Sequence, residues 1–167
     1  MPAPAAFSQA TSAAAFAAAL QSEQEALGSF VRLLQAEQAI LVDGDADRLA
    51  ALAPDKAAQI DLLTCMSGER KRHLAAQNLP DSADGMLTWL SRNSGSSAAV
   101  RKIWRQLLAY AETARQLNES NGKLIGSRLQ QNRVKLAVLQ TAGQCDGVYR
   151  PDGQLRPLRS GRSLDRA

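Results

Sequence analysis

The feature that most constrains the fold is a long run without proline, from Ser97 to Thr141. Apolar residues recur in it at the spacing of one helix face. One heptad position, the first row, is occupied by Val100, Leu107, Ala114 and Asn121. The other apolar position, the second row, is occupied by Ile103, Tyr110, Leu117 and Leu124. A helix of roughly 67 Å, at 1.5 Å per residue, cannot bury such a face alone, so other segments are predicted to cover it.

The heptad register shifts after Asn121. The pattern resumes four residues later in a set that we name the leucine face: Ile125, Leu129, Asn132, Leu136 and Leu139. A four-residue shift is a stutter, which locally unwinds a supercoil. Asparagines among the apolar positions, with Gly122 and Gly126 beside them, indicate either a soft, partly solvated helix or a half left uncovered for another protein's helix.

The first of the remaining segments carries leucine at intervals of seven, from Leu20 to Leu41. This repeat predicts a helix over residues 12–42 that touches more than one neighbour. Asp43, Gly44 and Asp45 then form a tight turn, in which the glycine caps one helix and Asp45 starts the next. So short a connection predicts that the first two helices are antiparallel neighbours.

A second helix is expected over residues 47–78, where Pro54 either kinks it or restarts it. The 79–96 connection contains glycine, proline and serine around a short apolar piece, predicted as one or two helical turns at 83–92. Its Trp89 either folds back over the bundle or stays exposed as a contact for another protein.

Together these segments predict an all-α fold. We expect an elongated antiparallel bundle of three long helices, with a short helix in the 79–96 connection and coiled-coil-like packing. The expected organisation is a disordered N-terminus over residues 1–11, a helical bundle over 12–142, and a flexible C-terminal segment with a basic tail over 143–167.

The sequence contains no arrangement typical of a catalytic or metal site. His73, the only histidine, is predicted at the surface of a basic helix end. Carboxylates such as Glu23 and Glu37 are predicted on solvated helix faces, and Lys56 is predicted to be solvated or snorkelling. We therefore expect no enzyme activity, no cofactor and no metal.

The formal net charge is +4, and much of the excess lies in the arginine-bearing residues after Tyr149. The rest of the chain is nearly neutral, so nucleic-acid binding is not expected. Cys65 and Cys145 belong to no ligand-spaced cluster and are interpreted as reduced thiols. No apolar run reaches the ~20 residues of a membrane span, and the first basic residue, Arg32, follows the alanine-rich stretch. We expect a cytoplasmic protein without membrane insertion.

In combination and order, these features resemble the FlgN family of flagellar type III export chaperones over about residues 16–154. The resemblance rests on the first leucine repeat and its Leu41-Val42-Asp43-Gly44-Asp45 ending, then on residues spread along the rest of the chain. These residues are Leu49, Leu52, Lys56, Arg70, Asn118, Asn121, Gly122, Leu124, Ile125, Asn132, Leu139, Tyr149, Pro151, Asp152 and Gly153. Pro54 and the tail after Gly153 depart from the family pattern.

The resemblance implies a chaperone that binds the C-terminal helical regions of the hook–filament junction proteins FlgK and FlgL. It would prevent their premature assembly and deliver them to the export gate. The implied client-binding residues lie in the late part of the long helix: Asn118, Asn121, Leu124, Ile125, Leu129, Asn132, Leu136 and Leu139. The implied contact with the gate protein FlhA is Tyr149, within the closing motif that also holds Pro151, Asp152 and Gly153. Alternatively, Tyr149 packs its ring at the helix end.

Two other functions stay open on the sequence. One is a coiled-coil adaptor of another secretion or division assembly, which would not bind FlgK or FlgL. The other is a basic helical nucleic-acid binder, which would be retained on DNA in a strongly salt-dependent way. The sequence also leaves self-association open.

Overall fold

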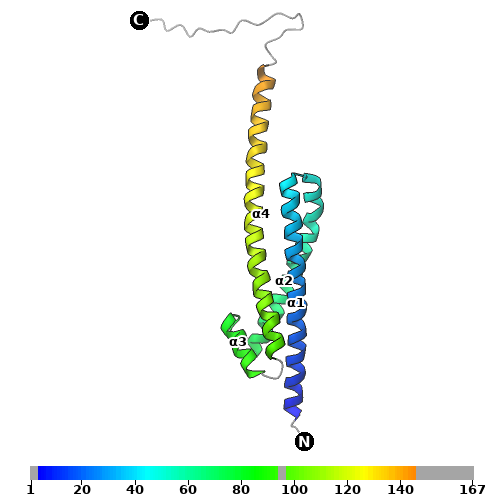
Figure 1. The fold of residues 1–167 in the computed structure, drawn as a ribbon, viewed down its shortest axis with the longest axis vertical. Coiled ribbons are helices and arrows are strands. Elements are labelled where there is room, and N and C mark those ends of the chain that lie inside the picture. Colours follow the sequence, from blue (N-terminus) through cyan, green and yellow to red (C-terminus); the bar gives the residue numbers. More distant parts are fainter. Residues whose placement is uncertain (1–3, 94–96, 146–167) are drawn as a thin grey trace, which may run out of the picture. The chain divides into compact units, whose positions relative to one another are not determined.

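The computed structural model describes residues 4–93 and 97–145. In this part of the chain there are four helices and no strand (Figure 1). They are α1 (Pro4–Asp43), α2 (Ala46–Ala76), α3 (Ala83–Arg92) and α4 (Ser97–Cys145). The predicted all-α fold is confirmed, because α1, α2 and α4 pack together through shared apolar clusters. The chain divides into two units, Met1–Leu124 and Ile125–Ala167, which are described separately below.

Two of the three long helices, α1 and α4, are longer than the sequence predicted. α1 begins at Pro4, whereas the sequence predicted a start at residue 12 and disorder before it. Proline is accepted at a first helical position because its missing N–H has no partner there, and alanine, abundant in this stretch, has the highest helix propensity. α4 ends at Cys145 rather than at residue 142, and the predicted flexible segment beyond it lies outside the described residues.

The turn between α1 and α2 follows the predicted capping. Gly44 has a φ of 80°, which glycine adopts without strain, and its N–H donates to the Ile40 carbonyl over 2.9 Å. The Asp45 carboxylate accepts from the Arg48 N–H at 2.9 Å and starts α2. Pro54 lies inside α2, so of the two alternatives the restart is wrong and the helix continues through this residue. Pro54 is exposed, where water can bond the carbonyl that proline leaves free.

The short helix α3 closes one end of the bundle. The Ser82 hydroxyl caps it by accepting from the Gly85 N–H at 3.1 Å. Trp89 is fully buried and contacts the ring of Phe16 edge-on at 4.6 Å between centroids. The prediction that Trp89 folds back over the bundle is therefore confirmed. Trp89 belongs to one apolar cluster of buried residues from all four helices: Phe16, Leu20, Leu74, Leu79, Met86, Leu90, Val100, Trp104 and Leu107.

Gly85→Ala is expected to lower the free energy of unfolding by about 2 kcal/mol or more. A Cβ at Gly85 would lie 2.0 Å from the Pro80 carbonyl oxygen, so the backbone would have to shift. The matched control is Gly122→Ala, where a Cβ would meet nothing within 4 Å. The control should gain up to about 1 kcal/mol from helix propensity. Urea unfolding measures both, and equal effects would contradict this account.

The heptad rows of α4 match the observed burial. All four residues of the first row, Val100 to Asn121, are buried, and all four of the second row, Ile103 to Leu124, are half-buried. A second apolar cluster of Phe30, Val31, Leu34 and Ala114, with Leu63 beside it, joins α1, α2 and α4. The heptad prediction for the first half of α4 is confirmed.

Candidate protein-binding surface

The inner face of α1 carries two glutamates at positions that otherwise hold apolar side chains. Glu23 and Glu37 are each only 6% exposed, so the prediction that they are solvated was wrong. Each pairs with a cation of α2: Glu23 with Arg70, and Glu37 with Lys56 at 2.8 Å. Arg70 also lies 5.6 Å from the ring centre of Trp104. Because buried charges must be paired, these two contacts restrict which residues of α1 and α2 can lie opposite each other.

Asn121 belongs to the same interior. Its side-chain amide donates to the Leu34 carbonyl at 3.0 Å and to the Glu37 carboxylate at 2.8 Å. The adjacent Ser120 hydroxyl accepts from the Gln38 amide at 3.0 Å. The placement of Asn121 on a client surface is therefore corrected, because this side chain holds α4 against α1. A buried asparagine at a heptad position fixes register, and Asn121 matches that role here.

His73 is also more enclosed than the sequence suggested. Its ring is half-buried and stacks on Phe16 with 3.9 Å between the ring centres, beside a cavity of about 470 Å³. Its Nε2 and the side-chain nitrogen of Gln77 lie within hydrogen-bond distance, at 3.0 Å. Burial lowers the pKa of His73 from its ordinary value because it disfavours the charged imidazolium. His73 lies in the last turn of α2, as predicted, but its ring is half-buried rather than fully at the surface.

Lowering the pH from 7.5 to 5.5 should lower the thermal unfolding midpoint, in part through His73. The pKa of His73 is lower in the folded chain than in the unfolded chain, so the unfolded chain takes up more protons as the pH falls below about 6.5. The stability that neutral His73 contributes to the folded chain is therefore fully present above about pH 6.5 and is lost progressively as the pH falls below it. His73→Gln should remove this part of the pH dependence. A midpoint difference between the two proteins that stays constant over this interval would contradict the assignment.

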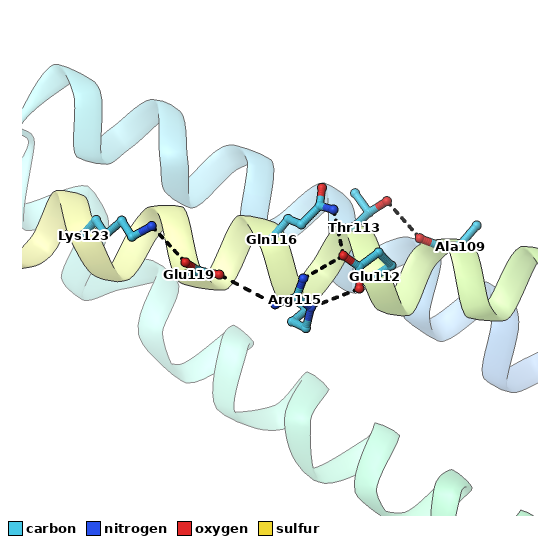
Figure 2. Close-up of polar contacts among 7 residues, drawn as sticks. All are labelled: Ala109, Glu112, Thr113, Arg115, Gln116, Glu119 and Lys123. Carbon is cyan, nitrogen blue, oxygen red and sulfur yellow. Dashed lines mark hydrogen bonds and ion pairs between the residues drawn. The ribbon is translucent and has the colours of Figure 1, made fainter. Parts of the chain in front are cut away.

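The outward face of α4 between residues 109 and 123 is polar and charge-balanced (Figure 2). Arg115 pairs with Glu112 at 2.8 Å and with Glu119 at 3.7 Å, and Lys123 pairs with Glu119 at 2.8 Å. Hydrogen bonds from Arg115 and then Gln116 lower the pKa of Glu112 to about 2, and a hydrogen bond from Lys123 lowers the pKa of Glu119. This solvated face satisfies its own charges and is a poor site for an apolar partner.

The described part of the second unit is the end of α4, from Ile125 to Cys145. Every described side chain from Leu129 to Thr141 is exposed, with Leu129 at 54% and Leu136 at 58%. Ile125, Asn132 and Leu139 are exposed as well, so the whole leucine face is accessible. Single exposed leucines are common on proteins, but a helical row of them is typical of an interaction surface.

The other predicted client-binding residues differ in their surroundings. Asn118 is exposed, and Leu124 is half-buried at the end of the second row. Val134 and Val138, which were not predicted as site residues, are exposed, and we name them the valine face. Their four-residue spacing places them together on a helix surface away from the leucine face, and that spacing was the available signal. Tyr149, Pro151, Asp152 and Gly153 lie outside the described residues.

None of the described helices has a stretch long and apolar enough to cross a membrane. Within residues 4–93 and 97–145, no group of three or more His, Cys, Asp or Glu side chains could hold a metal ion.

Comparison with known proteins gives one result. The FlgN family, described as FlgN protein, matches residues 12–157. No curated protein and no solved structure matches the chain. The family match spans all of α2 and α3 and most of α1, and it extends through α4 to the closing Tyr149-Arg150-Pro151-Asp152-Gly153 segment. Since it covers far more than half of the sequence, the chain belongs to the FlgN family.

Proposed function

We propose that this protein is a cytoplasmic flagellar export chaperone whose leucine face binds the C-terminal helical regions of FlgK and FlgL. By occupying those regions it prevents premature assembly of the junction proteins and delivers them to the type III export gate. Membership of the FlgN family supports a chaperone of flagellar proteins. The identity of the two clients, FlgK and FlgL, is taken from the family resemblance.

The observation that carries the proposal is the change in burial along α4. The first row is buried through Asn121, whereas the leucine face continues the apolar periodicity with exposed side chains. Apolar area removed from water contributes about 25 cal/mol per Å² before ordering costs, so a partner helix on this face would gain binding energy. The mode would be an amphipathic helix lying against another helix, as in other helix-in-groove contacts.

We further propose that α1, α2 and α4 alternate in direction and pack in a coiled-coil-like manner. The support is the order of the contacts along the chain. From Glu23 to Glu37 along α1, the partner on α2 moves back from Arg70 to Lys56. From Gly28 to Leu34 along α1, the partner on α4 moves forward from Tyr110 to Asn121.

For the closing segment we propose a contact with the export-gate protein FlhA through Tyr149. The support is that the family match extends through this motif to residue 157. Client binding and gate binding would then use different parts of the chain, the leucine face and the Tyr149 segment. A client could stay bound while the chaperone docks.

Calorimetry of the full chain with C-terminal fragments of FlgK and FlgL tests the proposal directly. We expect saturable binding of both fragments, and a separate titration with the cytoplasmic domain of FlhA should also show binding. If neither client fragment gives a binding signal, the chaperone proposal is wrong, and a structural coiled-coil adaptor becomes the favoured function. Strongly salt-dependent retention on DNA, with no client binding, would favour a nucleic-acid binder.

A further inference from the structure

The late part of α4 is basic as well as apolar. No aspartate or glutamate occurs between Glu119 and Asp146, whereas Arg128, Arg133 and Lys135 all lie in that interval. Arg133 and Lys135 are exposed. This contrasts with the charge-balanced face at residues 109–123, where Glu112 and Glu119 neutralise Arg115 and Lys123 (Figure 2).

The basic side chains have a defined place beside the leucine face. If Leu129 and Leu136 take heptad position a, then Ile125, Asn132 and Leu139 take position d. Arg133 then takes position e, and Arg128 and Lys135 take position g. Positions e and g border the apolar face on its two sides, and their charges select the partner helix in a coiled coil. Both borders of the leucine face are therefore positive.

A second copy of this chain is a poor occupant of the leucine face. In a parallel pair, position g of one helix meets position e of the next heptad in its partner, so Arg128 would face another Arg133. In an antiparallel pair, e meets e and g meets g, and neither set of positions offers an acidic side chain to pair with these cations. Like charges placed opposite each other oppose association.

We propose that the occupant of the leucine face is an amphipathic helix of another protein whose own e and g positions carry aspartate or glutamate. This inference rests on the proposed function in that it names the chemistry of the client helix. The leucines supply apolar contact, and the cations on the two borders select acidic helices over neutral or basic ones. Such selection acts on specificity and association rate more than on total affinity.

Two synthetic peptides test the proposal against the full chain. They share the same leucine heptads, and one carries glutamate and the other lysine at every e and g position. At low ionic strength the glutamate peptide should bind at least about tenfold more tightly, and the ratio should shrink as salt screens the charges. Arg133→Glu with Lys135→Glu should reverse the preference.

The matched control is Lys102→Glu with Arg105→Glu. It makes the same change in charge at exposed positions of the same helix, away from the leucine face. It should keep the preference for the glutamate peptide. Circular dichroism should show unchanged helicity in both double variants, because all four side chains are exposed.

Equal binding of the two peptides, or an unchanged preference in the Arg133→Glu, Lys135→Glu variant, would overturn the proposal. So would a dimer in sedimentation that Leu129→Asp abolishes, because a second copy would then occupy the face. If FlgK fragments bind the wild type and this double variant equally, the client assignment survives and the acidic-helix inference fails. If neither FlgK nor FlgL binds but the preference for the glutamate peptide holds, the acidic-helix inference stands. The client is then a protein other than FlgK or FlgL.

Discussion

Replacing both Leu129 and Leu136 with aspartate is expected to weaken binding of the FlgK fragment by about a hundredfold or more. Each leucine offers apolar surface that a partner helix would cover, and each aspartate would have to be desolvated beneath it. The loss of one buried leucine contact corresponds to roughly 2 kcal/mol, and about 1.4 kcal/mol is a tenfold change in Kd. Calorimetry with the same fragment measures the change.

The fold should tolerate these substitutions. Both side chains are exposed in the described structure, so neither contributes to the buried clusters of the bundle. Substitutions at such positions usually change the free energy of unfolding by less than about 0.5 kcal/mol. Helicity and the urea midpoint should therefore match those of the wild type, which separates a binding defect from unfolding.

Val134→Asp with Val138→Asp is the matched control for this prediction. These valines lie on the same stretch of α4 and are similarly exposed, but they belong to the valine face. A client helix lying on the leucine face alone would leave the affinity of this control nearly unchanged. Unchanged affinity in the leucine double variant would remove the proposed client site, and an equal loss in both variants would show that the client contacts both faces.

Much of the fold could be predicted because the helical periodicity is regular. The first row of α4 repeats every seven residues from Val100 to Asn121, and the side chains at that spacing share one helix face whatever packs against them. The turn at Gly44 was predictable for a local reason, since a glycine cap followed by an aspartate N-cap depends on few distant contacts. The extension of α1 back to Pro4 was missed because the first residues of a chain were expected to be disordered.

Burial of charge was the main error, although the signal was present. Glu23 follows Leu20 by three residues and Glu37 follows Leu34 by three, so both share the helix face of the leucines. Glutamate is rarely buried unless paired, and the partners Lys56 and Arg70 lie on another helix. The sequence of one helix cannot show which cation on another helix will neutralise its glutamates. Both were therefore predicted to be exposed to solvent, where glutamate usually lies.

The candidate protein-binding surface was likewise predictable only in part. The leucine face followed from periodicity, and the structure leaves its side chains exposed. Periodicity placed Asn121 in the first row and Asn118 in neither row, but it could not tell whether this chain or a partner covers Asn121. The structure separates them, because the Asn121 amide reaches Leu34 and Glu37 of α1 whereas Asn118 is exposed. The valine face was overlooked because only two residues, four apart, define it.

Lys56→Met is expected to lower the free energy of unfolding by about 3 kcal/mol. The substitution removes the cation from the Glu37 carboxylate and leaves that buried charge with the Asn121 amide. An uncompensated buried charge costs far more than the lost contact itself, because water cannot reach it fully. Urea unfolding at pH 7 measures the change.

Lys123→Met is the matched control for Lys56→Met. Its ion pair with Glu119 has the same 2.8 Å length as the pair between Lys56 and Glu37. The exposed fractions differ, at 75% and 55% for Lys123 and Glu119 against 24% and 7% for Lys56 and Glu37. Because solvent screens the exposed pair, the control should change stability by less than about 0.5 kcal/mol.

The double variant Lys56→Met with Glu37→Leu shows whether the pair stabilises the bundle or mainly fixes its register. Replacing a whole buried ion pair with apolar side chains is often neutral or stabilising, so the double variant should recover most of the roughly 3 kcal/mol lost by Lys56→Met. Recovery would mean that the charges mainly select which residues of α1 and α2 lie opposite each other. A double variant as unstable as Lys56→Met alone would instead show that Glu37 stabilises the fold through the Asn121 amide, independently of Lys56.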